Sequence, residues 1–189
     1  MHELRKDPIV GRWVIIAKSR AERPNAFTRS PVLVSTESCP FCPGNEHQTP
    51  AEVLAYREPG TQPNHEGWRV RAVPNKFPAL QFGEDLKQFG QGIYDAMRPL
   101  GVHEVIIESP QHVASTADLS EDNVREVLQC YRDRMLDLQR AGRLKYAAIF
   151  KNVGAAAGAT LEHVHSQLVA TPIVPLNVHN EISGSHQYF

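Results

Sequence analysis

The chain has 189 residues, of which 41% are hydrophobic and 22% charged, and this composition indicates one ordinary packed domain rather than a disordered segment. Its formal net charge of −1 lacks the basic excess of a general nucleic-acid binder. No apolar run approaches the ~20 residues that a membrane helix needs, and the N-terminal residues lack the apolar segment of a signal peptide. We therefore expect a cytoplasmic protein that binds neither nucleic acid nor membranes.

The predicted elements, taken in chain order, are mostly strands. Segments rich in β-branched, aromatic or alternating residues are expected to be strands: 12–17, 68–73, 103–109, 146–150 and 163–170. Stretches with many prolines, glycines and polar residues are expected to be irregular or loops: 18–38, 43–67 and 80–100. A helix with one apolar stripe is expected to begin after Ser120, which caps it, and to end at Gly142. This order predicts an α+β domain with a mainly antiparallel sheet and a packed helix.

A Cys-x-x-Cys pair indicates a metal site. Three cysteines, two of them paired as Cys39 and Cys42, suit a reducing compartment and a metal better than a disulfide framework. A closed zinc site needs two further ligands, and on spacing alone His47 is a candidate. His103 is another candidate, although its place at the start of a strand favours a structural role. The alternative is a redox or incidental thiol pair, whereas Cys130, inside the predicted helix, is expected in the core.

The histidine-rich strand near the C-terminus is the most informative segment. Side chains alternate along a strand, so His163, His165 and Gln167 are expected to share one face. Gly154 and Gly158, in the loop before it, would let backbone N–H groups approach a phosphate closely. The alternative is an edge strand with two solvent-facing histidines.

This His-x-His-x-Gln pattern resembles the histidine-triad superfamily, and specifically the N-terminal half of its galactose-1-phosphate uridylyltransferase branch. Other segments resemble the same family and follow its order: 4–8 with 12–13, 20–24, 39–42, 75–80 and 103–112. The resemblance covers nearly the whole chain. It implies that residues 1–189 form an N-terminal, histidine-triad-like nucleotidylyltransferase domain, which is a fragment if a second half follows, and that the protein is a homodimer.

The resemblance also implies a mechanism. His165 would attack the α-phosphorus of UDP-glucose, release glucose 1-phosphate and pass the uridylyl group from a covalent intermediate to galactose 1-phosphate, a step of galactose metabolism. Imidazole suits this role because it is a nucleophile near pH 7 and then a good leaving group. A neighbouring carbonyl should keep its other ring nitrogen protonated. Gln167 can bond a phosphoryl oxygen but cannot act as a general acid, which favours transfer to phosphate over hydrolysis.

The resemblance nominates the remaining site residues. Substrate contacts are expected from Arg20, Arg23, Asn75, Phe77, Asn152, Thr160 and Gln167. Zinc is expected to be bound by Cys39, Cys42, His112 and His163. Since His163 lies two residues from His165, zinc there would position the nucleophile rather than do chemistry.

Two positions depart from the family pattern and leave the base and the sugar open. Val164 stands where the family often has proline, and Lys76 stands where the best-known bacterial uridylyltransferases carry an acidic residue. Members similar to ADP-glucose phosphorylase relax both positions and share the Glu-Ser-Pro segment at 108–110. The alternatives are therefore an adenylyl-transferring enzyme of that type and a zinc-stabilised nucleotide-binding module without turnover. A nucleotide hydrolase is disfavoured by Gln167.

Overall fold

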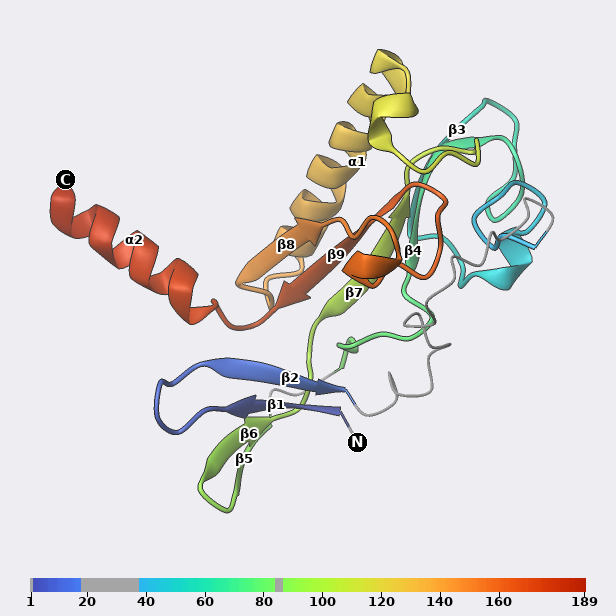
Figure 1. Cartoon of the computed structure of the whole chain (residues 1–189). Helices are drawn as coiled ribbons and strands as arrows, with labels where there is room; N and C mark the ends of the chain where they lie inside the picture. The colour runs from blue at the N-terminus through green and yellow to red at the C-terminus, as the bar shows by residue number, and fades with distance from the viewer. Residues whose placement is uncertain (1, 18–37, 84–86) are drawn as a thin grey trace.

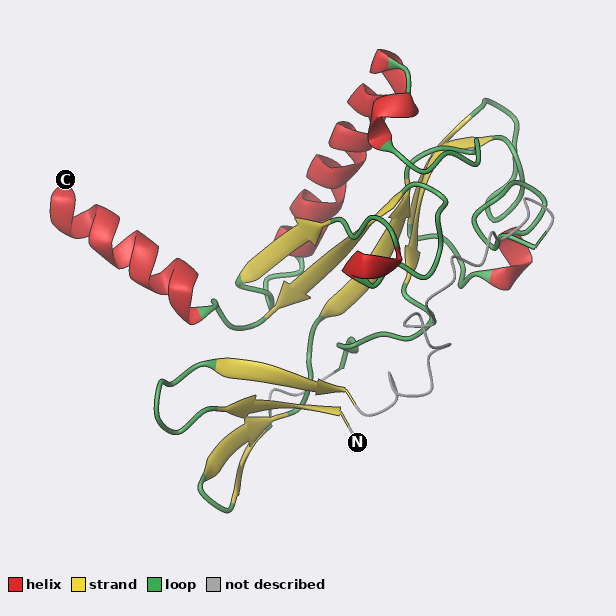
Figure 2. Ribbon diagram, in the orientation of Figure 1, coloured by secondary structure: helices red, strands yellow, loops and turns green. Residues whose placement is uncertain are grey.

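The computed structural model describes residues 2–17, 38–83 and 87–189, and the strands of these ranges form two antiparallel sheets (Figure 1). The four-stranded sheet contains, in spatial order, β2 (Trp13–Ala17), β1 (His2–Lys6), β6 (Tyr94–Met97) and β5 (Gln88–Gln91). The five-stranded sheet contains, in spatial order, β3 (Leu54–Arg57), β4 (Trp68–Pro74), β7 (Val102–Ile107), β9 (His165–Thr171) and β8 (Tyr146–Phe150). Figure 2 shows the helices of these ranges: η2 (Glu46–Gln48), η3 (Thr116–Asp118), α1 (Glu121–Arg140), η4 (Ala155–Ala157) and α2 (Leu176–Tyr188).

The predicted α+β class, with a mainly antiparallel sheet and a packed helix, is confirmed. Each predicted strand occurs, with small shifts at its ends, as β2, β4, β7, β8 and β9. The prediction of loops over 43–67 and 80–100 was wrong in part, because these stretches contain β3 and the β5–β6 hairpin. These three strands have four residues each, and none of them shows an alternation of buried and exposed residues. β1 and α2 were not predicted either.

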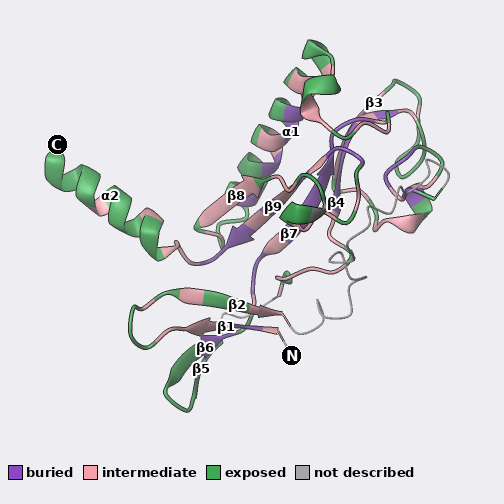
Figure 3. Ribbon diagram, viewed as in Figure 1, coloured by how far each residue is buried: buried purple, intermediate pink, exposed green. Residues whose placement is uncertain are grey.

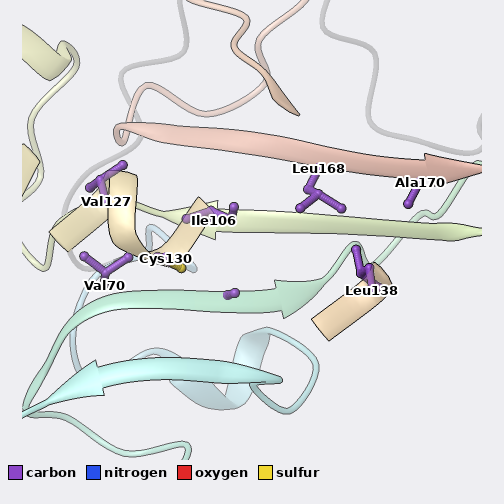
Figure 4. Packing of buried hydrophobic residues seen from close by; sticks show 8 residues of the cluster. Val70, Ile106, Val127, Cys130, Leu138, Leu168 and Ala170 are labelled. Atoms are coloured by element: carbon purple, nitrogen blue, oxygen red, sulfur yellow. The ribbon is translucent and has the colours of Figure 1, made fainter. Parts of the chain in front are cut away.

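Helix α1 covers one face of the five-stranded sheet and forms the main core with it. Ser120 caps the helix as predicted, because its Oγ accepts the N–H of Asn123 at 3.2 Å. The buried residues of the helix pack on the centre of the sheet, as Figure 4 shows for Cys130 beside Ile106. Cys130 is 1% exposed, which confirms it as a core residue. Gly142, with φ +70°, follows the last turn and ends the helix.

The opposite face of the same sheet carries the Cys39–Cys42 segment. Residues directly opposed across β7 and β9 share a face, and the register pairs Ile107 with His165 and Val105 with Gln167. These positions face away from the core beneath α1 and toward a second apolar cluster that includes both cysteines. The sheet therefore separates a closed core from the face on which His165 and Gln167 lie.

Figure 3 shows that the buried residues concentrate in the central strands, whereas α2 is mostly exposed. No residue of α2 is buried, and the helix leads away from both sheets (Figure 1). Among the described residues, no helix is both long and apolar enough to cross a membrane.

Candidate active site and metal centre

Two cysteines and two histidines converge beside the five-stranded sheet. The ligand atoms of Cys39, Cys42, His112 and His163, which we call the metal cluster, all lie within 4.8 Å of one another. Both cysteines and His163 are buried, and His112 is half-buried. His47 is exposed and is not a member, and neither is His103, so neither alternative from spacing is supported.

The distances in the metal cluster fit a tetrahedral ion. The Nδ1 atom of His163 lies 3.6 Å from both cysteine sulfurs, and the Nδ1 atom of His112 lies 3.2 Å from Cys42 Sγ. Zinc bonds of about 2.3 Å to sulfur and about 2.0 Å to nitrogen would place such atoms roughly 3.6 Å apart. These three distances are close to those of a tetrahedral zinc site, so the cluster could hold a metal ion.

The second ring nitrogen of His163 supports the same interpretation. Its Nε2–H donates to the carbonyl oxygen of Ser109 at 2.8 Å, which leaves the lone pair on Nδ1, the atom that faces the sulfurs. Burial lowers the pKa of His163 to about 4, so the ring is neutral at pH 7, as a metal ligand must be. Burial, followed by the neighbouring Cys39, raises the pKa of the Cys42 thiol to about 11 when no cation is bound.

His165 has the opposite arrangement. Its Nδ1–H donates to the backbone carbonyl oxygen of His163 at 2.7 Å, so its lone pair is on Nε2. This carbonyl is the group that the sequence required but could not identify. The ring of Phe41 packs against that of His165 at 5.2 Å between centroids and 64° between planes. The expectation that His163 belongs to the strand was wrong, because β9 begins only at His165 and His163 is a member of the metal cluster. The rings of both histidines nevertheless lie on the side of the sheet that carries the cysteine segment, since both contact Phe41.

A cleft of about 380 Å³ is lined by His165. Its lining includes the following predicted site residues: Asn75, Phe77, Thr160, His165 and Gln167. The remaining lining comes mainly from the segments around Phe41, Pro50 and Lys76. The structure thus brings together five predicted residues from three separate segments of the chain.

Asn152 lies in a neighbouring cavity of about 110 Å³ that also reaches His163 and His165. Gly154 and Gly158 both have φ +77°, a conformation that favours glycine, so the loop between β8 and β9 depends on them. The predicted approach of this loop to a phosphate stays a prediction. Two predicted phosphate contacts, Arg20 and Arg23, lie outside the described residues.

The sequence did not identify His103 as a neighbour of the cleft. This residue on β7 is 5% exposed, and its Nε2 lies 2.9 Å from Gln167 Oε1 and 3.1 Å from Asn75 Nδ2. Its Nδ1 accepts the backbone N–H of Ala79 at 3.0 Å. The signal in the sequence was a histidine in a mainly apolar strand, where a buried polar residue needs polar partners.

The sequence also did not identify a buried carboxylate behind β9. Glu108 is fully buried and accepts hydrogen bonds from Tyr131, Ser166, Lys151 and Thr116. Burial would raise its pKa, but the hydrogen bonds from Lys151, Ser166 and Tyr131 outweigh this effect and lower it. The ionised carboxylate thus connects Tyr131 on α1, Ser166 on β9 and Lys151, which begins the loop between β8 and β9.

Residues 1–175 match the model of a known family, described as galactose-1-phosphate uridyl transferase, N-terminal domain. The chain belongs to this family. The resemblance drawn from the sequence motifs is therefore confirmed.

Individual relatives in the galactose-1-phosphate uridyl transferase family carry different names. An ADP-glucose phosphorylase of Arabidopsis thaliana is 36% identical over 192 residues, which cover 99% of this chain and 53% of that protein. A galactose-1-phosphate uridylyltransferase of Thermotoga maritima is 25% identical over 190 residues, which cover 100% of this chain and 52% of that protein. The chain thus spans about half the length of these relatives.

Solved structures of the family have the same fold. A uridylyltransferase matches with a TM-score of 0.72 and 27% identity, over 98% of this chain and 51% of that one. An ADP-glucose phosphorylase from Arabidopsis thaliana with bound ADP-glucose matches with a TM-score of 0.65 and 34% identity, over 100% of this chain and 55% of that one.

Proposed function

We propose that this domain transfers a nucleoside monophosphate from a nucleotide sugar to a phosphate acceptor through His165. The observation that carries the proposal is the hydrogen bond from Nδ1–H of His165 to its neighbouring carbonyl, which puts the lone pair on Nε2 of a residue that lines a cleft of about 380 Å³. A neutral imidazole with its proton fixed on the far nitrogen is prepared for nucleophilic attack.

The chemistry requires two displacements at one phosphorus. Nε2 forms a bond to the α-phosphorus while the bond to the bridging oxygen breaks, and the electron pair leaves with the sugar 1-phosphate. An oxygen of the acceptor phosphate then forms the new bond, and the imidazole leaves with the electron pair of the P–N bond. Both leaving groups are stable without protonation, so neither step needs a general acid. An amide, Gln167, which cannot act as one, is therefore compatible with this chemistry.

Two substrate assignments differ in the base and the sugar. The family model and the Thermotoga relative support UDP-glucose with galactose 1-phosphate. The higher identity to the ADP-glucose phosphorylase, whose structure holds ADP-glucose, favours an adenine nucleotide. We rank ADP-glucose first because 36% identity over 99% of the chain exceeds 25% over a similar length.

Intact-mass measurement tests both assignments. Incubation with ADP-glucose should add the mass of AMP, and incubation with UDP-glucose that of UMP. The adduct that forms faster identifies the base, and His165→Gly should form neither. A native protein without any adduct, together with saturable nucleotide binding, would instead indicate the binding module without turnover.

The metal cluster is proposed to bind zinc. Two thiolates and two neutral imidazoles form a common structural zinc set, and the proposed role is to hold His163, and through it the start of β9, in place. The homodimer, the cytoplasmic location and a single domain over residues 1–189 remain predictions, the first of which light scattering on the purified protein tests directly.

A further inference from the structure

His103 is held at both nitrogens, and this fixes the position of its proton. The backbone N–H of Ala79 can only donate, so Nδ1 of His103 must accept it at 3.0 Å. The proton of the neutral ring is then on Nε2. The single acceptor among the Nε2 contacts above is Oε1 of Gln167, at 2.9 Å.

The same tautomer constrains Asn75. Its Nδ2 lies 3.1 Å from Nε2 of His103, but a protonated Nε2 has no lone pair to accept a second hydrogen. The Oδ1 atom of Asn75 is already occupied, because it accepts the backbone N–H of Phe77 at 2.9 Å. Both amide oxygens next to the cleft therefore accept from the protein itself.

From this arrangement we infer that His103 is a positioning residue for the reaction proposed above: it holds the Gln167 oxygen, so that the amide N–H groups of Gln167 serve the phosphoryl oxygens in the cleft. The two ends of a side-chain amide have nearly the same shape, and only their partners decide which end faces a ligand. With its oxygen turned inward, Gln167 presents donors beside His165. Donors suit an anion, whereas an inward-facing nitrogen would leave an oxygen to repel it.

The position of His103 explains why a histidine is needed there. The residue is 5% exposed and lies on β7, two positions from the residue that pairs with Gln167. Only an imidazole can accept from the Ala79 backbone on one side and donate to Gln167 on the other with one rigid ring. Leucine fills a comparable volume without either function. Glutamine keeps an amide nitrogen able to donate to Gln167.

The first test measures the tautomer directly and does not depend on catalysis. The chain is labelled with 15N-histidine, and the resonances of His103 are those lost in His103→Gln. We expect Nδ1 at the shift of an unprotonated ring nitrogen and Nε2 at that of a protonated one. A proton on Nδ1 of His103 at neutral pH would overturn the inference, whatever the protein catalyses.

The second test measures how fast the His165 adduct forms from the preferred nucleotide sugar. Partners that orient a functional group commonly contribute about ten- to a hundredfold, so His103→Leu should lower this rate by that factor and leave nucleotide affinity nearly unchanged. His103→Gln should recover part of the rate. His179→Leu, at an exposed position on α2, is the matched control and should be unaffected.

A double-mutant cycle decides whether His103 acts through Gln167. In the Gln167→Ala background, His103→Leu should have no further effect on the rate, because the group that it orients is gone. Equal losses in both backgrounds would overturn the inference. If the native chain formed no adduct at all, the proposed function would fail, while the 15N measurement would still decide the tautomer of His103.

Discussion

His163 and His165 are separated by one residue, yet the structure holds their rings in opposite tautomers. His163 donates from Nε2 to the carbonyl oxygen of Ser109 and directs Nδ1 at the sulfurs of Cys39 and Cys42. His165, which lines the cleft, donates from Nδ1 to the carbonyl oxygen of His163, so its lone pair is on Nε2. In each case a backbone carbonyl, rather than a carboxylate, decides which nitrogen is available.

The difference in burial follows from the same backbone. His163 is fully buried before β9 begins, whereas His165 is half-buried as the first residue of the strand. A buried neutral ring suits a structural metal ligand, and a ring at the wall of a cleft suits a group that meets substrate. Identical side chains thus take different roles because the backbone gives each one a different acceptor and a different depth.

The largest expected effect comes from the nucleophile. His165→Gly should lower the rate of nucleotidyl transfer by about a thousandfold or more, because it removes the proposed nucleophile. Zinc content and thermal stability should stay near native values, since His165 is not a member of the metal cluster. Residual adduct at the native rate, detected by intact mass, would place the nucleophile elsewhere.

The corresponding experiment at His163 removes one ligand of the metal cluster. His163→Ala should abolish zinc binding by elemental analysis and lower the free energy of unfolding by about 3 kcal/mol or more, because binding energy of the metal is folding energy. Cys39→Ser should act in the same direction. His47→Ala is the matched control, at the exposed histidine that spacing alone nominated, and should keep its zinc. Full zinc occupancy in His163→Ala would mean that His163 is not a metal ligand and that the two histidines do not differ in this role.

The sequence predicted the main strands, α1 and the cysteine pair because these depend on local patterns. The apolar stripe of α1 and its Ser120 cap are visible within one segment. The partnership between Cys42 and His112 spans 70 residues, and only the family resemblance, not spacing, nominated it. Strand β3 could not be found because four half-buried residues show no alternation.

Which ring nitrogen of each histidine carries the proton could not be predicted from the sequence, for a physical reason. The tautomers depend on the register that pairs β7 with β9 and on carbonyls whose direction is set by the turn before His165. The same register brings His103 to Gln167 across 64 residues. Residue types and spacing identify the groups of the site, but the position of each proton follows from backbone geometry alone.

An intermediate effect is expected at Glu108, whose carboxylate supports β9 from the other face through Ser166, the residue between His165 and Gln167. Glu108→Gln should lower the free energy of unfolding by about 2 kcal/mol, because Lys151 loses its buried charge partner. Chemical denaturation of both proteins measures this difference. An unchanged free energy would mean that the network is not needed for stability.

The contribution of Glu108 should also depend on pH. Its pKa is lowered in the folded chain, so its stabilising effect is present above the unfolded value of about 4.3 and is lost as the pH falls through the folded value. The difference in unfolding free energy between native protein and Glu108→Gln should therefore be constant near pH 7 and shrink below about pH 4.3. A difference that grows as pH falls would contradict the lowered pKa.

The smallest expected effect tests whether the two histidines are coupled. Phe41 packs its ring against His165 at 5.2 Å and against His163 at 6.1 Å between centroids, so the cysteine segment contacts the nucleophile directly. Phe41→Leu keeps an apolar side chain but loses ring contacts worth about 1 kcal/mol, and the adduct should form several-fold more slowly with zinc content unchanged. Phe89→Leu, on the other sheet, is the control. If Phe41→Leu forms adduct at the native rate, the metal cluster supports the fold without helping to position His165.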